Sequence, residues 1–174
     1  MADGGDINEP RKFPPNAVHL VRTTQQIHVQ LSQMADQKAS ILMGATFVIF
    51  TIAIGQAKGG HTALPLLILG GFAFFSAMFA ILAILPASRV KATGPVNLLF
   101  FGSFTRLDQD DYIEQALDVL AADETVYRTM LRDIYQNGAV LARKKYRLLG
   151  YAYRILLAGL VCSALAFVYV MASV

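Results

Sequence analysis

The densest group of charged side chains in the 174-residue sequence is the basic segment Arg143-Lys144-Lys145-Tyr146-Arg147, which comes directly before a long apolar stretch. Guanidinium and ammonium groups bind phosphate, so this segment suits an anionic lipid headgroup or a phosphate-bearing ligand. The alternative is that it anchors the adjacent span, with its long side chains reaching the membrane interface. From the residues alone, the anchor is the simpler interpretation.

Two further charges lie beside or within apolar stretches. Asp36 is the only acid near the start of the first apolar stretch, where an isolated carboxylate is costly, so we expect a cation next to it. The candidates are Arg89, Lys91 and the basic segment; the alternative is a water-exposed carboxylate at a helix bend. Arg154 lies about two turns into the last apolar stretch, and snorkelling toward the cytoplasmic face explains it more simply than a functional role.

No pattern typical of catalysis is present in the sequence. There is no nucleophile elbow, no phosphate-binding glycine loop and no plausible pair of catalytic carboxylates. His19, His28 and His61 lack the helical spacing of a metal site, and the single cysteine, Cys162, allows neither an internal disulfide nor a cysteine-based metal site. We therefore expect no catalytic residue, no metal and no cofactor, in a protein that is not an enzyme.

These charges are positioned by elements that composition identifies as membrane spans. Apolar residues make up 55% of the chain, above the roughly 45–50% of soluble domains, and the charges lie almost wholly outside three long stretches. We expect transmembrane helices at residues 39–57, 64–86 and 150–172. The first carries no charge and is about 28 Å long as a helix, close to the thickness of the hydrocarbon layer. The fold class is an all-α membrane protein.

The remaining residues form a tail and two cytoplasmic parts. Residues 1–15 are expected to be a flexible tail, and residues 16–38 an amphipathic helix that buries its apolar stripe on another cytoplasmic helix. The region 87–147, between spans two and three, is expected to be helical, with its last helix continuing directly into the third span. The stripe of the N-terminal helix consists of Leu20, Ile27, Leu31 and Met34.

The distribution of lysine and arginine predicts the orientation in the membrane. Thirteen of these bases flank the spans on one side and only Lys58 lies on the other, so the N-terminus should be cytoplasmic and the C-terminus periplasmic. This bias also explains the net charge of +3, and we expect no nucleic-acid partner. Small residues on one side of spans two and three permit close helix contact, either within the chain or in a homo-oligomer. They are Ala73, Ser76, Ala77, Ala80 and Ala83, and Gly159, Ser163 and Ala166.

Several short motifs, taken in order, resemble those of the Pycsar transmembrane effector family. The run from Ala35 to Leu42, where the first span begins, resembles that family's first motif, with Asp36, Lys38 and Ser40 as its polar members. The loop after span two resembles its second motif, and the run 141–149 resembles its approach to the last span. The loop motif contains Asn97, Phe100, Phe101 and Gly102.

The resemblance implies a role in bacterial antiviral defence. A partner uridylate or cytidylate cyclase would make cyclic CMP or cyclic UMP, and the effector would respond by impairing the inner membrane, so that growth stops or infection aborts. It would act in the lipid bilayer as a homo-oligomer. The residues suited to such a ligand are Arg143, Lys144 and Arg147 for the phosphate and Tyr146 for stacking on the pyrimidine. Asp36 and Lys38 would form a hinge at the membrane.

Two other functions fit the same sequence. One is a structural membrane protein that scaffolds partners through its cytoplasmic helices. The other is an unregulated, holin-like pore, against which the substantial cytoplasmic part argues.

Overall fold

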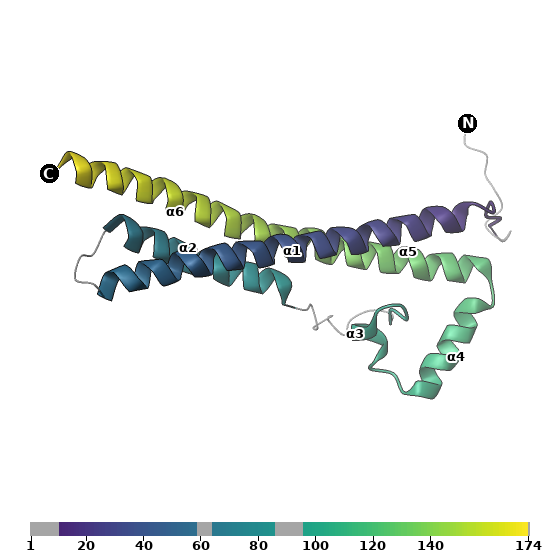
Figure 1. The fold of residues 1–174 in the computed structure, drawn as a ribbon. Helices are drawn as coiled ribbons and strands as arrows, with labels where there is room; N and C mark the ends of the chain where they lie inside the picture. The colour runs from purple at the N-terminus through teal and green to yellow at the C-terminus, as the bar shows by residue number, and fades with distance from the viewer. Residues whose placement is uncertain (1–10, 59–63, 86–95, 174) are drawn as a thin grey trace. The chain divides into compact units, whose positions relative to one another are not determined.

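The computed structural model describes residues 11–58, 64–85 and 96–173, and within these ranges the protein is all-α, without a strand. Three helices are long and apolar enough to cross a membrane, which confirms the predicted fold class (Figure 1). Several predicted features lie outside the described residues. They are most of the 1–15 tail, the end of the 64–86 span and the start of the 87–147 region.

The first and last helices are longer than the spans that they contain. The elements in order are α1 (Ala17–Lys58), α2 (Leu64–Ile84), α3 (Phe101–Phe104), α4 (Gln109–Leu120), α5 (Asp123–Val140), the π-helical turn η1 (Leu141–Tyr146) and α6 (Arg147–Ala172). No glycine or proline occurs between Ala17 and Met43, so the predicted amphipathic helix and the first span form one helix. The predicted continuation into the third span is confirmed, since helical structure is unbroken from Asp123 to Ala172.

Contacts divide the described chain into two units. The first unit comprises residues 11–29 and 96–138, and the second comprises residues 30–85 and 139–173. Both units therefore contain part of α1.

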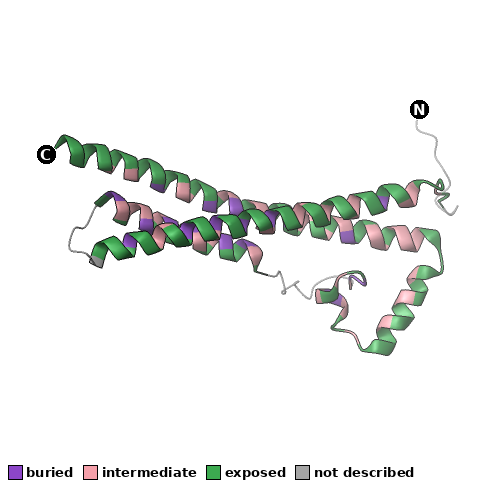
Figure 2. Cartoon of the chain, in the orientation of Figure 1, coloured by how far each residue is buried: buried purple, intermediate pink, exposed green. Residues whose placement is uncertain are grey.

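The core of the second unit is built from small side chains of three helices. Buried residues concentrate on the faces where α1, α2 and α6 meet (Figure 2). Four of the five small residues predicted to share one side of span two are buried within the chain, Ala77 being half-buried, and Gly159 of α6 is buried too. Of the two alternatives, packing within one chain is therefore the role of these faces. The core residues are Ala35, Ala39, Leu42, Ala80, Ala83, Leu149 and Ala152.

Two glycines allow the backbones of the second unit to approach closely. A Cβ atom added at Gly70 of α2 would lie 2.6 Å from the Cβ of Ala53 on α1. One added at Gly159 of α6 would lie 2.3 Å from the Cβ of Phe72 on α2. Separations this short are impossible between real side chains, so only glycine fits at either position.

Two hydroxyl groups join α2 to α6. Ser76 Oγ donates a hydrogen bond of 2.8 Å to the Ala152 carbonyl oxygen, and Ser163 Oγ donates one of 2.8 Å to the Pro65 carbonyl oxygen. Pro65 lies in the first turn of α2, where a proline is tolerated because the turn needs no donor there.

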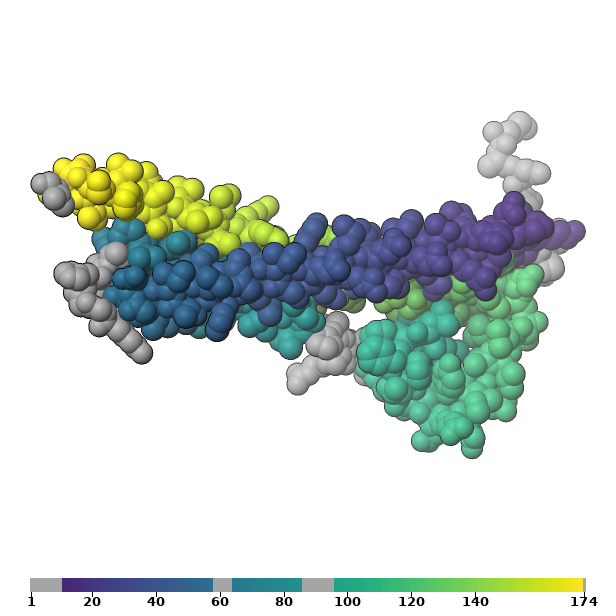
Figure 3. All heavy atoms as spheres, in the orientation of Figure 1, coloured from purple at the N-terminus to yellow at the C-terminus, as the bar shows by residue number. Residues whose placement is uncertain are grey.

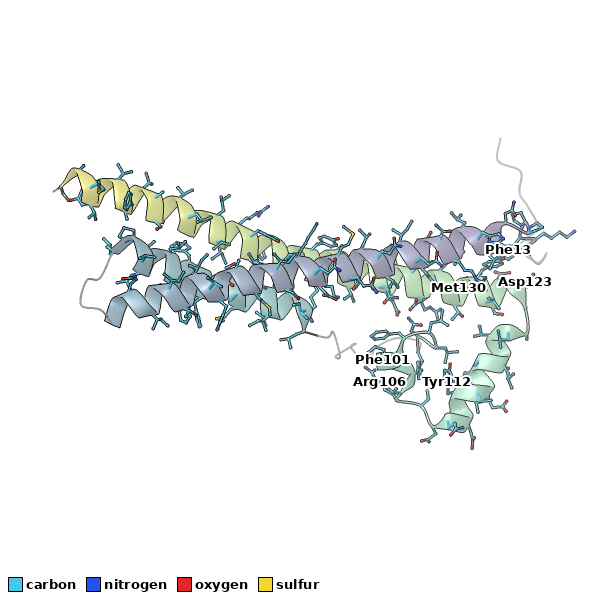
Figure 4. All side chains as sticks on the ribbon, in the orientation of Figure 1. Phe13, Phe101, Arg106, Tyr112, Asp123 and Met130 are labelled. Atoms are coloured by element: carbon cyan, nitrogen blue, oxygen red, sulfur yellow. The ribbon has the colours of Figure 1, made fainter. Side chains whose placement is uncertain are left out.

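The first unit combines the start of α1 with α3, α4 and α5. Phe13 stacks near Tyr127 of α5 with ring centroids 4.5 Å apart, and Phe104 of α3 lies 4.9 Å from Tyr112 of α4. Figure 4 shows Tyr112 on the side of α4 that faces the α3 segment. Helix α4 buries none of its residues, and Asp108 is its N-cap by position without a side-chain capping bond.

Within the chain, the apolar stripe of α1 does not pack on another helix as predicted. Leu20, Ile27 and Met34 stay exposed, while Leu31 is half-buried. The buried face starts one residue later, at Val21, and one residue turns the helix by about 100°. Polar contacts, described below, explain this choice of face.

We predict that Gly70→Ala destabilises the helix bundle by about 1–3 kcal/mol, because the added methyl group would collide with Ala53. Thermal unfolding of the detergent-purified chain would measure the change. The matched control is Gly71→Ala, where nothing lies within 4 Å of an added Cβ, so the better helix propensity of alanine should leave stability unchanged or slightly higher. Equal effects of the two substitutions would contradict the close approach.

Candidate functional site

The centre of the candidate site in the second unit is an ion pair between Lys145 and Asp36. The Lys145 ammonium lies 2.8 Å from Asp36 Oδ1 and 2.7 Å from Oδ2, and it donates a third hydrogen bond, of 2.7 Å, to Ser32 Oγ. Its side chain is mostly buried, whereas that of Asp36 is partly exposed. The predicted cation beside Asp36 is therefore Lys145 of the basic segment; the other two candidates, Arg89 and Lys91, lie outside the described residues.

Two neighbours of Lys145 also hold the helices of this unit. Lys144 Nζ donates a hydrogen bond of 2.8 Å to the Leu85 carbonyl oxygen, just past the end of α2. Tyr146 donates from its hydroxyl to the Leu31 carbonyl oxygen on α1, at 3.3 Å. Three consecutive side chains thus reach two different helices, and the basic segment does more than anchor the third span.

The backbone of the basic segment is a π-helical turn. Leu141–Tyr146 carries hydrogen bonds from residue i to i+5, whereas α5 before it and α6 after it are α-helical. Such turns are rare inside α-helices and are often found at functional sites. Nothing in the sequence predicted it.

The arginines of η1 and α6 remain available to a ligand. Arg143, Arg147 and Arg154 are all exposed, and none of them forms an ion pair within the described part of the chain. Arg143 and Arg147 are four residues apart and so lie near one another on the helix surface. Of the four predicted ligand-binding residues, these two present unpaired guanidinium groups, while Lys144 and Tyr146 contact neighbouring helices.

The motif at the start of the first span lies within the unbroken α1. Ser40 Oγ donates to the Asp36 carbonyl oxygen at 2.9 Å, which is a bond within the helix. The Lys38 carbonyl oxygen accepts a long hydrogen bond of 3.4 Å from the Tyr153 hydroxyl on α6. Among the described residues, Asp36 is the one of these three whose side chain contacts another helix.

A second polar cluster lies in the first unit and is centred on Asp133 of α5, which is only 6% exposed. Its carboxylate accepts hydrogen bonds from three side-chain amides, those of Asn97 at 3.0 Å, Gln25 at 3.2 Å and Asn137 at 2.9 Å. A buried carboxylate is costly unless it is well hydrogen-bonded, and these three donors supply that need. The cluster joins α1, α5 and the loop before α3.

Asn97 connects the loop motif to this cluster. Its amide nitrogen also donates to Gln136 Oε1 at 2.8 Å, and its Oδ1 accepts from the backbone N–H of Leu99 at 3.0 Å. The backbone N–H of Asn97 donates to Ser103 Oγ at 2.9 Å. With all of these bonds, Asn97 fixes the loop on the first unit.

The other residues of the loop motif have different roles. Phe100 and Phe101 have ring centroids 5.1 Å apart, and Phe101 projects outward (Figure 4). A Cβ added at Gly102 would lie 2.6 Å from the Phe100 ring, so glycine makes room for that ring.

The sequence analysis missed the Asp133 cluster. Its only signal is that Asp133, Gln136 and Asn137 fall on one side of a helix, at spacings of three and four. Their partners Gln25 and Asn97 are far away in the chain. Gly138 of α5 is the neighbour of His28 of α1, whose Cε1 would lie 3.1 Å from a Cβ added at this glycine.

Comparison with known protein families assigns almost the whole chain to one of them. The family model of the Pycsar effector protein domain matches residues 19–172 of the 174-residue chain. No curated protein and no solved structure matches the chain.

We predict that Asp36 and Lys145 are energetically coupled by about 1 kcal/mol. The partial exposure of Asp36 reduces the value expected for charge-assisted hydrogen bonds. A double-mutant cycle of Asp36→Asn and Lys145→Met, measured by thermal unfolding in detergent, would give the coupling. The cycle of Asp36→Asn with Arg147→Met is the control and should show none; equal coupling in both cycles would contradict the pair.

We predict that Asn97→Ala destabilises the first unit by about 1–3 kcal/mol, because it leaves buried oxygens of Asp133 and Gln136 without a donor. Amide hydrogen exchange over residues 96–104 should speed up, since the loop loses its attachment to α5. Gln26→Ala, which removes an exposed amide from α1, should leave that exchange unchanged. Unchanged exchange in Asn97→Ala would contradict the role of this residue.

Proposed function

Because the chain belongs to the Pycsar effector protein domain family, whose role is antiviral defence, we propose that it is the membrane effector of a cyclic pyrimidine nucleotide signal. A partner cyclase makes cyclic CMP or cyclic UMP on infection. The effector responds by impairing the bacterial inner membrane, and growth stops before new phage are released. The observation that carries the proposal is the family match over residues 19–172, which covers the three apolar helices and the helices between them.

The basic segment supplies the contacts that the messenger needs. A cyclic nucleotide carries one negative charge on its phosphate, and the exposed guanidinium groups of Arg143 and Arg147 present several donors to such a group. The ring of Tyr146 supplies an aromatic surface for the pyrimidine. We assign phosphate binding to the two arginines and base stacking to Tyr146.

The neighbours of these residues connect binding to the membrane helices. Lys144, Lys145 and Tyr146 hold α2 and α1 through the bonds to Leu85, Asp36 and Leu31. A ligand that draws Tyr146 away from α1 weakens one of these contacts. The messenger shifts the assembly only by as much as it binds the membrane-active arrangement more tightly than the resting one.

The proposed orientation places this segment where the messenger is made. The excess of lysine and arginine on one side of the spans puts the N-terminus, the loop motif and the basic segment in the cytoplasm, and the C-terminus in the periplasm. The protein itself is no enzyme in this proposal, and the cyclase performs the only chemical step.

We predict that cyclic CMP or cyclic UMP, added outside vesicles that carry the purified chain with its cytoplasmic side outward, causes release of an enclosed dye. Arg143→Gln combined with Arg147→Gln should shift the required messenger concentration upward at least tenfold, because two charged donors are lost (about 1.4 kcal/mol per factor of ten). Arg132→Gln, an exposed arginine of α5, is the matched control and should respond as the unchanged protein does.

Three outcomes of this experiment would contradict the proposal. Dye release without any messenger would indicate an unregulated pore. A chain that stays inert to both nucleotides, and that leaves phage growth unchanged in cells expressing an active cyclase, would favour a scaffold. An equal response of the double variant would exclude the two arginines as the phosphate site.

A further inference from the structure

Helix α1 carries an exposed apolar stripe beside the face that it buries within the chain. This stripe includes Leu20, Ile27 and Met34 of the stripe predicted from the sequence and continues toward the end of the helix. Its members are seven residues apart, and all are exposed, by 72%, 48%, 46%, 71% and 56% in chain order. We call it the outer stripe. It consists of Leu20, Ile27, Met34, Ile41 and Val48.

The outer stripe is separate from the face that α1 buries within the chain. That buried face also repeats at intervals of seven, through Val21, Ala35 and Leu42. Each of its positions is one residue later, about 100° around the helix. In the space-filling view, α1 is uncovered on the face turned toward the viewer (Figure 3).

Only part of the outer stripe is satisfied by lipid. Ile41 and Val48 lie in the uncharged stretch 39–57, where lipid tails cover them. Leu20, Ile27 and Met34 precede that stretch, and Leu20 lies 19 residues, or about 28 Å of helix, before Ala39. A series of exposed apolar side chains at this distance from the hydrocarbon needs another protein surface.

The seven-residue spacing indicates what kind of surface fits. Residues seven apart stay on one side of helices that wind around one another in a left-handed supercoil, and they supply one of the two seam positions of each heptad. The partner must continue the same spacing from water into lipid, as α1 itself does. Two copies with the same orientation in one membrane present their α1 helices in parallel, so identical positions meet.

The residues beside the outer stripe permit this pairing of identical helices. From Thr23 to Ala35, the part bordered by Arg22 and Asp36, the chain has no Asp, Glu, Lys or Arg, so over these residues parallel copies in register place no like charges against each other. The neighbours are mainly glutamines, whose amides both donate and accept hydrogen bonds. The same lack of lysine and arginine argues against a lipid surface as the occupant.

We propose that the outer stripe joins α1 to α1 of a second copy of this chain in a parallel coiled coil. This deepens the proposed function, on which it relies for the shared orientation of the copies, and it names the surface through which the effector assembles. The in-water part, at Leu20, Ile27 and Met34, specifies the pairing, and the part in the membrane continues it.

Disulfide cross-linking in isolated membranes tests the pairing. In a Cys162→Ser background, the full-length chain would carry a single cysteine from Leu20→Cys, Ile27→Cys or Met34→Cys. Gln26→Cys and Gln33→Cys are matched controls, each exposed and each one residue before a stripe position. After mild oxidation, the cross-linked dimer should be at least fivefold more abundant at the three stripe positions than at the two control positions. We expect this difference in at least one of three conditions: without nucleotide, with cyclic CMP or with cyclic UMP.

A second set of variants separates pairing from local reactivity. Maleimide labelling under denaturing conditions would show that every thiol can react. Ile27→Glu should reduce the Met34→Cys cross-link at least fivefold, because like charges then meet in register, whereas Gln26→Glu should leave it unchanged. Equal cross-linking at stripe and control positions under every condition, or no effect of Ile27→Glu, would overturn the proposal.

The cross-linking result tests the coiled coil separately from the proposed antiviral function. Cross-linking confined to the stripe, in a protein that never responds to a messenger, would keep the coiled coil and reject the proposed function. A messenger response in a protein without stripe-specific cross-links would do the reverse.

Discussion

Lipid tails are as apolar as the side chains of the spans, so the hydrophobic effect does not hold these helices together once they are in the bilayer. What remains is close packing and hydrogen bonding, and both require the backbones to approach. The second unit meets this requirement with alanines in its core and with Gly70 and Gly159, where no other residue fits. The position of the basic segment and of Asp36 depends on this bundle, because each is carried by one of its helices.

The carboxylates of Asp36 and Asp133 are stabilised by different kinds of partner. Asp36 is partly exposed and has a cation, Lys145, whereas Asp133 is buried and has three amides. Amides are neutral donors, and several of them share the stabilisation of a single charge. The same cluster explains the orientation of α1: Gln25 must reach Asp133, and this turns Val21 inward and leaves Leu20 outside. A polar contact thus overrides the apolar pattern of the helix.

The sequence predicted the parts of the fold that depend on local composition. The three spans follow from the length of uncharged stretches, and the continuous last helix follows from the lack of a strong stop signal. The cation beside Asp36 followed from the cost of an isolated carboxylate near lipid, and Lys145 was among the candidates. The Asp133 cluster could not be predicted, because its donors come from three distant segments. The π-helical turn has no known local signature, and the face that α1 buries depends on partners that the pattern of α1 does not contain.

The bonds from Ser76 to Ala152 and from Ser163 to Pro65 tie spans two and three to each other. Translating α2 along α6 would break both bonds and strand two hydroxyls among lipid tails, where no water replaces the lost acceptors. Within residues 39–57, by contrast, the hydroxyls of α1 bond only to its own carbonyls, as Thr46 and Thr51 do. Hydroxyl bonds within the spans therefore tie α2 to α6, whereas the hydrogen bonds that α1 forms with η1 and α6, at Leu31, Ser32, Asp36 and Lys38, all come before residue 39.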